Sequence, residues 1–301
     1  MTEPLVSLVM PAWNPRPEWL RAAVESALGQ RGCRVEVLVV DDGCPQPVEP
    51  LLSAVADERL RVLRVEHGGE SAARNAGIAA AAGTHFRFVD ADDVLERDST
   101  ARLLRLVGGA EDLLGYGATM FCDSELRPLW KLTCRIQGDA LEDCLLGRFT
   151  VRPFALLFPR RVVESAGEWD TGSRVSHDWD YILRALEHAR ARGETETAVY
   201  YRKHAASATS DAGVVGEIGG RRVLDRYFAR HPEQRGTRLE RKAYARLDAM
   251  LARMYATKRD FRRSGSALVR AAREPGAVAE ELRQAQPALT SALTRRLIGF
   301  R

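Results

Sequence analysis

Three carboxylates follow a short apolar run in the segment Phe88-Val89-Asp90-Ala91-Asp92-Asp93. Carboxylates this close together repel one another unless a cation or hydrogen-bond donors lie between them. Hard divalent ions take oxygen ligands, and Mg²⁺ commonly shares one or two carboxylates with a substrate phosphate. The pattern therefore favours a metal and phosphate site at a strand end. The alternative is a solvated acidic turn that caps the next helix, which a short motif does not exclude when taken alone.

Four segments of the first hundred residues have the composition of buried strands and alternate with helical patterns. The strands are expected at Val6–Met10, Val35–Val40, Leu60–Val65 and Phe86–Val89. Apolar residues recur at helical spacing after Pro17, and the Ala-rich segment Ser71–Ala82 ends before Gly83. Strands and helices that alternate with short connections predict right-handed βαβ units and a parallel sheet.

The ends of these four strands carry polar or Gly-rich residues. They are Trp13-Asn14, Asp41-Asp42, His67-Gly68-Gly69 and Asp90-Ala91-Asp92-Asp93. Ligands of parallel α/β sheets bind beyond the carboxyl ends of the strands. The sequence therefore predicts one shared site at this edge of the sheet.

The periodicity loosens after about residue 110. Further strands are expected at Leu113–Cys122, Leu129–Cys134, Phe154–Phe158 and Thr195–Tyr201, with helices at Arg161–Ala166 and His177–Ala189. From Val214 onward the pattern is helical, at Val223–Ala229, Leu239–Thr257, Ala267–Arg273 and Leu289–Leu297. We predict an α/β domain over residues 1–212, with halves of about 1–110 and 111–212, and a basic helical region over 213–301.

Charge is distributed unevenly along the 301 residues. Residues 221–301 hold 20 Lys and Arg against 8 Asp and Glu, whereas residues 1–220 hold 25 against 33. The basic segment could meet anionic lipid, another copy of the chain or an acidic partner, or it could be an Arg-rich solvated face. We expect no nucleic-acid partner.

Several simple features bear on the compartment. No apolar run is long enough to span a bilayer, and Met1-Thr2-Glu3-Pro4 lacks the basic region of a signal peptide. Five scattered cysteines without a CxxC pair argue against a zinc site or a disulfide framework. We expect a cytoplasmic protein, either free or peripheral to the inner face of the membrane.

Four motifs in order resemble the signatures of glycosyltransferase family 2. They are Val6-Ser7-Leu8-Val9-Met10-Pro11-Ala12-Trp13-Asn14, Val39-Val40-Asp41-Asp42-Gly43, Ser71-Ala72-Ala73-Arg74-Asn75-Ala76-Gly77 and Val89-Asp90-Ala91-Asp92-Asp93. The likeness covers roughly residues 5–205. It implies the GT-A fold, a Rossmann-like, mostly parallel sheet flanked by helices, which binds a nucleotide diphosphate sugar. The C-terminal helices would extend this fold.

The resemblance implies a set of residues that bind the nucleotide sugar. In it, Trp13 stacks on a flat base and Asp42 accepts the N3 proton of uracil. Trp13 could instead be a core aromatic residue. Asp41 rather than Asp42 could contact the uracil, or Asp41 could cap the next turn. Arg74 could form a surface ion pair. The full set is Pro11, Ala12, Trp13, Asn14, Asp41, Asp42, Gly69, Arg74, Asp90, Ala91 and Arg202.

The metal ligands implied by the resemblance are Asp92 and His204. The cofactor would be Mn²⁺ or Mg²⁺, and Asp93 is either a third ligand or a helix N-cap. His204 belongs to the segment Tyr200-Tyr201-Arg202-Lys203-His204, which resembles the family's Y-R-x-H-x-x-S tail, completed by Ser207 and Ser210.

The catalytic base implied by the resemblance is Asp178. It lies in His177-Asp178-Trp179-Asp180, where His177 replaces the family's usual Glu and could also accept a proton. The alternative role of Asp178 is the N-cap of a helix beginning at Asp180.

The function that follows is an inverting, metal-dependent glycosyltransferase of the hexosyltransferase type, with a donor expected to be UDP-linked. The acceptor would be a peptide, a natural product, a glycan or a lipid-linked precursor. Two alternatives are a sugar-phosphate nucleotidyltransferase and a non-catalytic protein with the same fold. The absence of a Gly-rich, Lys- or Arg-containing loop after the first strand argues against the nucleotidyltransferase.

Overall fold

The computed structural model describes residues 3–173, 175–204 and 212–283. The chain divides into two compact units, one of Met1–Cys144 with Arg148–Ala208 and one of Leu145–Gly147 with Thr209–Arg301. The division expected at residue 212 stays a prediction. The predicted helix Leu289–Leu297 and the motif residues Ser207 and Ser210 lie outside the described residues.

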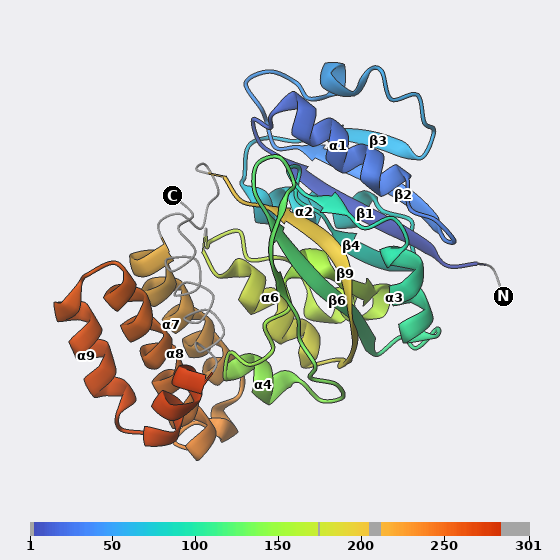
Figure 1. The fold of residues 1–301 in the computed structure, drawn as a ribbon. Coiled ribbons are helices and arrows are strands. Elements are labelled where there is room, and N and C mark those ends of the chain that lie inside the picture. The colour runs from blue at the N-terminus through green and yellow to red at the C-terminus, as the bar shows by residue number, and fades with distance from the viewer. Residues whose placement is uncertain (1–2, 174, 205–211, 284–301) are drawn as a thin grey trace. The chain divides into compact units, whose positions relative to one another are not determined.

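The first unit is built on a mixed sheet (Figure 1). Its strand order is β3-β2-β1-β4-β8-β6-β9-β5, with β7 paired to β6. The strands are β1 (Leu5–Ala12), β2 (Arg34–Asp41), β3 (Leu60–Arg64), β4 (His85–Phe88), β5 (Val94–Leu95), β6 (Leu113–Cys122), β7 (Pro128–Leu132), β8 (Leu156–Pro159) and β9 (Arg190–Arg202).

Strands β1 to β4 form the parallel part of the sheet that the sequence predicts. The apolar runs of β1, β2 and β4 are buried on both faces, as parallel strands covered by helices require, whereas β3 is partly exposed. In the β1 and β2 pair, Ala12 lies opposite Asp41, and β4 pairs with β1 up to Val9 opposite Phe88. This register brings the carboxyl ends of the three strands to one edge.

Helices flank this sheet. Those that pack on its strands are α1 (Pro17–Leu28), α2 (Glu70–Ala80), α3 (Ser99–Val107), α5 (Arg160–Ala166) and, through Tyr181, α6 (His177–Leu186). The short helix α4 (Leu141–Leu145) contacts α6, because Nε1 of Trp179 donates to the backbone oxygen of Cys144. Short 3₁₀ turns lie at Glu49–Leu52 and Pro153–Ala155. Gly77 lets α2 approach β1 and β2 closely, since a Cβ there would lie 2.3 Å from Cγ1 of Val9 and 3.2 Å from Cγ2 of Val40.

The second half of the sheet differs from the first. β8 is antiparallel to β4 and β6, whereas β9 runs parallel to β6. β9 begins at Arg190, earlier than the predicted Thr195, because its amino-terminal end continues the pairing with Leu113 of β6. The short elements β5 and α4 were not expected from the sequence, and the helix expected after Asp93 begins only at Ser99, as α3.

The second unit is helical and includes α7 (Ala212–Arg230), α8 (Arg238–Thr257) and α9 (Phe261–Ala271), drawn in orange to red in Figure 1. A 3₁₀ turn spans Pro232–Gln234. Thr237 and Asp260 cap α8 and α9, each accepting from the backbone N–H three residues on. None of the described helices is long and apolar enough to cross a membrane.

Candidate nucleotide-sugar site

The ends of β2 and β3 are connected through the carboxylates of Asp41 and Asp42. Asp41 is 1% exposed, and it accepts hydrogen bonds from the backbone N–H groups of Cys44 (2.8 Å) and Val48 (3.1 Å) and from Nη1 of Arg64 (2.6 Å). Burial acts to raise the pKa of Asp41, but these hydrogen bonds outweigh it and lower the pKa below its ordinary value. Asp41 thus holds its own turn, which was the alternative role expected from the sequence.

Asp42 reaches across to the loop that follows β3. Its Oδ1 accepts from the N–H of Gly68 at 2.8 Å and its Oδ2 from the N–H of Gly69 at 3.0 Å. Nδ1 of His67 lies 2.8 Å from the same Oδ2. The carboxylate is 2% exposed and joins the end of β2 to the start of α2.

Trp13 stands beside this cluster, directly after β1. Half of its surface is exposed, so the alternative of a core aromatic residue is wrong. The His67 ring stacks on it with centroids 3.9 Å apart and planes 24° from parallel. Pro11 and Ala12 are buried at the end of β1, and Asn14 turns the chain with a φ of 45° while its N–H donates to Sγ of Cys44.

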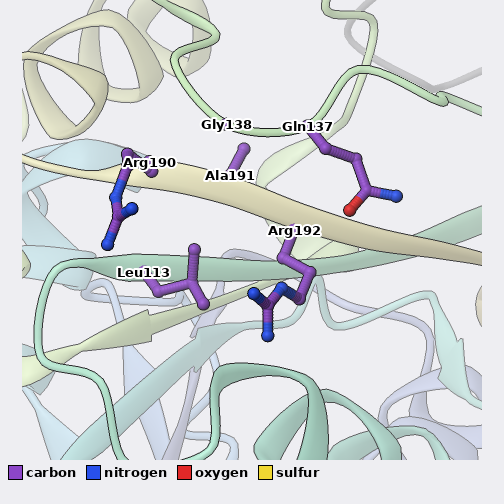
Figure 2. A pocket seen from close by; sticks show the side chains of 6 residues that line it. All are labelled: Leu113, Gln137, Gly138, Arg190, Ala191 and Arg192. Carbon is purple, nitrogen blue, oxygen red and sulfur yellow. The ribbon is translucent and has the colours of Figure 1, made fainter.

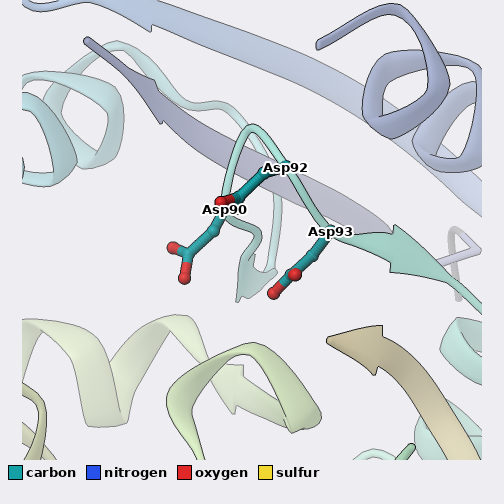
Figure 3. A group of neighbouring side chains, drawn as sticks. All are labelled: Asp90, Asp92 and Asp93. Atoms are coloured by element: carbon teal, nitrogen blue, oxygen red, sulfur yellow. The ribbon is translucent and has the colours of Figure 1, made fainter. Parts of the chain in front are cut away.

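The three aspartates of the DxDD segment lie on the loop between β4 and β5 (Figure 3). One oxygen from each of Asp90, Asp92 and Asp93 lies within 4.8 Å of the other two. Burial raises the pKa of Asp90 to about 7, with Glu70 and Asp92 adding like charge. Burial also raises the pKa of Asp93 well above its usual range. A cation among these oxygens would reverse both shifts.

The end of β9 and the residues after it are attached to this loop. Nε2 of His204 lies 2.7 Å from Oδ2 of Asp92. Asp93 accepts from the backbone N–H of Arg202 at 2.9 Å, and Nε of Arg202 donates to the backbone oxygen of Asp92 at 2.9 Å. The helix after Asp93 begins only at Ser99, so Asp93 is not its N-cap.

Arg74 forms the cationic side of the site. Its side chain is 3% exposed, and it pairs with Glu70 one turn earlier and with Oδ1 of Asp90 at 2.9 Å. The guanidinium lies over the ring of Trp169 at 4.4 Å. Arg74 Nε and Nη1 are buried without a hydrogen-bond partner among the described residues. The N–H groups on these two nitrogens can bind an anionic or hydroxyl-bearing ligand.

The residues expected to supply the catalytic base open helix α6. Ser176 is the N-cap and α6 begins at His177, so the alternative that Asp178 caps a helix starting at Asp180 is wrong. Asp178 accepts from the N–H of Trp179 at 2.8 Å and lies 3.6 Å from Nη1 of Arg152. Nε2 of His177 lies 3.4 Å from Glu70, which connects this helix to Arg74.

Asn75, from the motif Ser71–Gly77, links helix α2 to the backbone of Trp169. Asn75 donates to the backbone oxygen of Trp169 (3.0 Å) and accepts from the N–H of Trp169 (2.8 Å). Trp169 in turn stacks on Tyr181 of α6 with centroids 4.0 Å apart. The Arg74-Asn75 dipeptide therefore connects α2 to the part of the chain that carries Asp178.

Several residues at the site were not selected from the sequence. Glu70 and His67 belong to a turn noted only for its glycines, and an acidic residue at the first position of a helix was the available signal for Glu70. Trp19 of α1 packs its ring against His204, with centroids 4.7 Å apart, and no motif marks it. Arg152 lies in a loop without a recognisable pattern.

A hollow on the first unit is separate from this site (Figure 2). It is lined by Leu113, Gln137, Gly138, Arg190, Ala191 and Arg192 and encloses about 190 Å³. Leu113 and Arg190 begin β6 and β9, whereas Arg202 ends β9 next to Asp92. The hollow therefore lies at the other end of these strands.

This combination of a mixed, helix-flanked sheet and an acidic loop at its carboxyl edge defines the GT-A class of protein. The family model described as "Glycosyl transferase family 2" matches residues 7–163. The chain belongs to glycosyl transferase family 2. The matched range ends before His177, Asp178, Arg202 and His204.

Named relatives agree with this membership. The chain is 30% identical over 221 residues to the uncharacterized glycosyltransferase EpsJ of Bacillus subtilis, covering 68% of this chain and 63% of EpsJ. It is 32% identical over 198 residues to the succinoglycan biosynthesis protein ExoO of Rhizobium meliloti, covering 61% of this chain and 56% of ExoO. The match thus spans less than two thirds of either relative.

Solved structures confirm the fold. TarS of S. aureus, residues 1–349 in complex with UDP-GlcNAc, has a TM-score of 0.59 and 14% sequence identity, covering 87% of this chain and 90% of TarS 1–349. The same TarS fragment in complex with UDP has a TM-score of 0.57. The predicted α/β fold of the GT-A type is therefore confirmed.

Proposed function

We propose that this chain transfers a sugar from a nucleotide diphosphate sugar, with a uridine base, to an acceptor hydroxyl or amine with inversion at the anomeric carbon. The observation that carries the proposal is the contact between Asp92 and His204, two candidate metal ligands from distant parts of the chain. Oδ2 of Asp92 lies 2.7 Å from Nε2 of His204, and the neighbouring Asp90 pairs with Arg74. The UDP and UDP-GlcNAc complexes of TarS support the choice of donor.

The residues present fit a divalent cation. Asp92 and His204 offer an oxygen and a nitrogen, with Asp90 near. Burial, with like charge from Glu70 and Asp92 added to it, raises the pKa of Asp90, and a cation here would favour its ionised form. When bound there, Mn²⁺ or Mg²⁺ supplies positive charge that offsets the charge developing on the leaving diphosphate. Asp93, which accepts from the backbone of Arg202, acts as a positioning residue.

The remaining residues bind and orient the substrates. Trp13 and Asp42 receive the base, and the free N–H groups of Arg74 bind the sugar or diphosphate. Asp178, whose side chain is 31% exposed, takes the proton from the acceptor as its oxygen or nitrogen attacks the anomeric carbon. His177 orients Glu70 and Arg74. Arg202 already donates to the backbone oxygens of Asp92 and Ser124, so it supports the acidic loop.

A donor screen tests this proposal. UDP-, GDP- and dTDP-sugars are incubated with the protein and with Mn²⁺, Mg²⁺ or excess chelator, and the released nucleotide is measured. We expect slow release of UDP that requires the metal. Turnover of a GDP-sugar alone would contradict the uridine assignment, and full activity in chelator would contradict the metal.

Two other functions give different results in related assays. A nucleotidyltransferase would release pyrophosphate from UTP and a sugar phosphate. A non-catalytic protein with this fold would bind no donor in calorimetry with Mn²⁺. The acceptor, peripheral membrane contact or self-association of the basic helices, and a cytoplasmic location remain predictions from the sequence.

A further inference from the structure

His67 makes the two contacts that the proposed function assigns to the donor's base. Its imidazole stacks on the exposed ring of Trp13, with centroids 3.9 Å apart and planes 24° from parallel. Its Nδ1 lies 2.8 Å from Oδ2 of Asp42. A uracil ring would stack on the same indole and donate its N3–H to the same carboxylate. The imidazole and a uracil base would thus both be flat rings that direct one N–H at Asp42.

The imidazole can leave this position without disturbing its surroundings. The His67 side chain is 46% exposed. Its described ring contacts are the stack on Trp13 and the approach of Nδ1 to Oδ2 and, at 3.0 Å, to the backbone oxygen of Asp42. Gly43 packs closely against the backbone of His67, since a Cβ on Gly43 would lie 2.8 Å from the backbone N of His67. If the ring turns outward, Asp42 keeps the N–H groups of Gly68 and Gly69, and the incoming N–H replaces Nδ1. The buried carboxylate therefore stays satisfied.

We infer that the imidazole of His67 competes with the donor's nucleobase for the face of Trp13 and the carboxylate of Asp42. The inference rests on the proposed function, because it takes the donor to be a nucleotide sugar. It gives His67 a selective role. A base must stack and also donate an N–H to Asp42 to displace the imidazole, whereas a base that only stacks replaces the contact with Trp13 and none of those with Asp42.

Affinity measurements on His67→Ala test this competition. Loss of one aromatic stack and one hydrogen bond that the base must otherwise displace should tighten UDP binding about tenfold. Binding of inorganic pyrophosphate with Mn²⁺ should not change, because pyrophosphate has no base. His188→Ala, an exposed histidine just beyond the other end of α6, serves as the matched control and should bind both ligands as the unaltered protein does.

Each result has a definite consequence. Weaker UDP binding by His67→Ala would show that His67 contacts the base, which overturns the competition. A Kd for UDP equal to that of the unaltered protein would overturn it too. So would an equal gain in affinity for pyrophosphate, because pyrophosphate has no base. If neither the unaltered protein nor His67→Ala binds any of UDP, GDP, CDP and ADP, the proposed function fails together with this inference. UDP binding that His67→Ala leaves unchanged overturns the inference alone.

A spectroscopic measurement gives an independent reading. The Cε1–H proton of His67, assigned by its loss in His67→Ala, should be shifted by the ring current of Trp13. Saturation with UDP and Mn²⁺ should move this resonance toward the position of an exposed histidine, while pyrophosphate should not. A resonance that keeps its shift at saturating UDP would show that the base binds without displacing the imidazole, which would overturn the inference.

Discussion

Nε2 of His204 lies 2.7 Å from Oδ2 of Asp92, although 112 positions separate the two residues in the chain. The separation is that of a hydrogen bond, and a divalent ion bound here would be held by these two side chains in place of that contact. The pairing of β5 with β9, which places Val94 opposite Tyr200, brings them together.

Asp92→Asn should therefore remove metal binding and metal-dependent release of the nucleotide. An amide keeps the shape but loses the charge that holds a divalent ion. We expect a loss of at least about 100-fold in turnover, the scale of removing electrostatic stabilisation of the leaving group. Calorimetry with Mn²⁺ and a UDP-release assay measure both effects.

Asp93→Asn is the matched control for this change. Its amide oxygen can still accept from the N–H of Arg202, so the loop and Mn²⁺ affinity should be retained. If Asp93→Asn loses as much metal affinity as Asp92→Asn, Asp93 is a ligand rather than a positioning residue.

Asp178→Asn should bind the donor normally and transfer the sugar poorly. Removing a general base typically costs 10²- to 10⁴-fold in rate, because the acceptor then attacks with its proton in place. His177→Asn, which keeps a polar group near Glu70, should reduce the rate much less. Single-turnover rates with an acceptor, once one is found, distinguish the two, and the reverse ranking would assign the base to His177.

Glu70 should make the free energy of unfolding fall as the pH becomes acidic. Burial acts to raise the pKa of Glu70, but Arg74 and His177 outweigh it and lower the pKa to about 2. A carboxylate with a lowered pKa in the folded state contributes stability above its unfolded value of about 4.5, and this contribution is lost as the pH falls from there toward about 2. The side chain is 40% exposed, so solvent reduces the effect.

Urea unfolding of Glu70→Gln and the unaltered protein at several pH values measures this contribution. The difference in their unfolding midpoints should be largest at pH 6 and should shrink steadily below about pH 4.5. A difference that stays constant from pH 6 to pH 3.5 would show that Glu70 titrates at its ordinary pKa in the folded protein.

Gly77→Ala should destabilise the first unit. The new methyl group would lie 2.3 Å from Cγ1 of Val9, in a packed contact between α2 and the sheet, and overpacking of this kind costs about 1–3 kcal/mol. Gly265→Ala on α9 is the control, since no atom lies within 4 Å of its Cβ position. It should stabilise by about 0.5–1 kcal/mol, because alanine favours a helix interior. Thermal unfolding compares the two, and a stable Gly77→Ala would mean that α2 can shift outward.

The first half of the fold could be predicted because its signals are local. Buried strands such as β2 are runs of branched apolar residues, and α1 begins at Pro17 with apolar residues at helical spacing. β5 could not be predicted, because two residues carry no periodicity and their strand exists only through pairing with β9. α6 ends at Leu186 rather than at the predicted Ala189, since the chain turns there to begin β9.

The candidate site, like the fold, could be predicted where the signal is local and could not where it depends on tertiary contacts. Motifs located Asp92, Asp178 and His204, because their residue types and spacing are the signal. Contacts across the fold could not be read from spacing. That Asp41 is used by its own turn, or that His67 covers Trp13, depends on side-chain directions set by tertiary packing.

The distance along the chain between Asp92 and His204 also bears on how the protein matures. A growing chain that ends before β9 contains the DxDD loop but lacks the imidazole and the strand that support it. Contacts between residues so far apart form late, since closing a long loop is entropically costly. If the chain binds a divalent ion as proposed, we expect strong binding only in the completed fold, where the ion would connect the DxDD loop to the residues after β9.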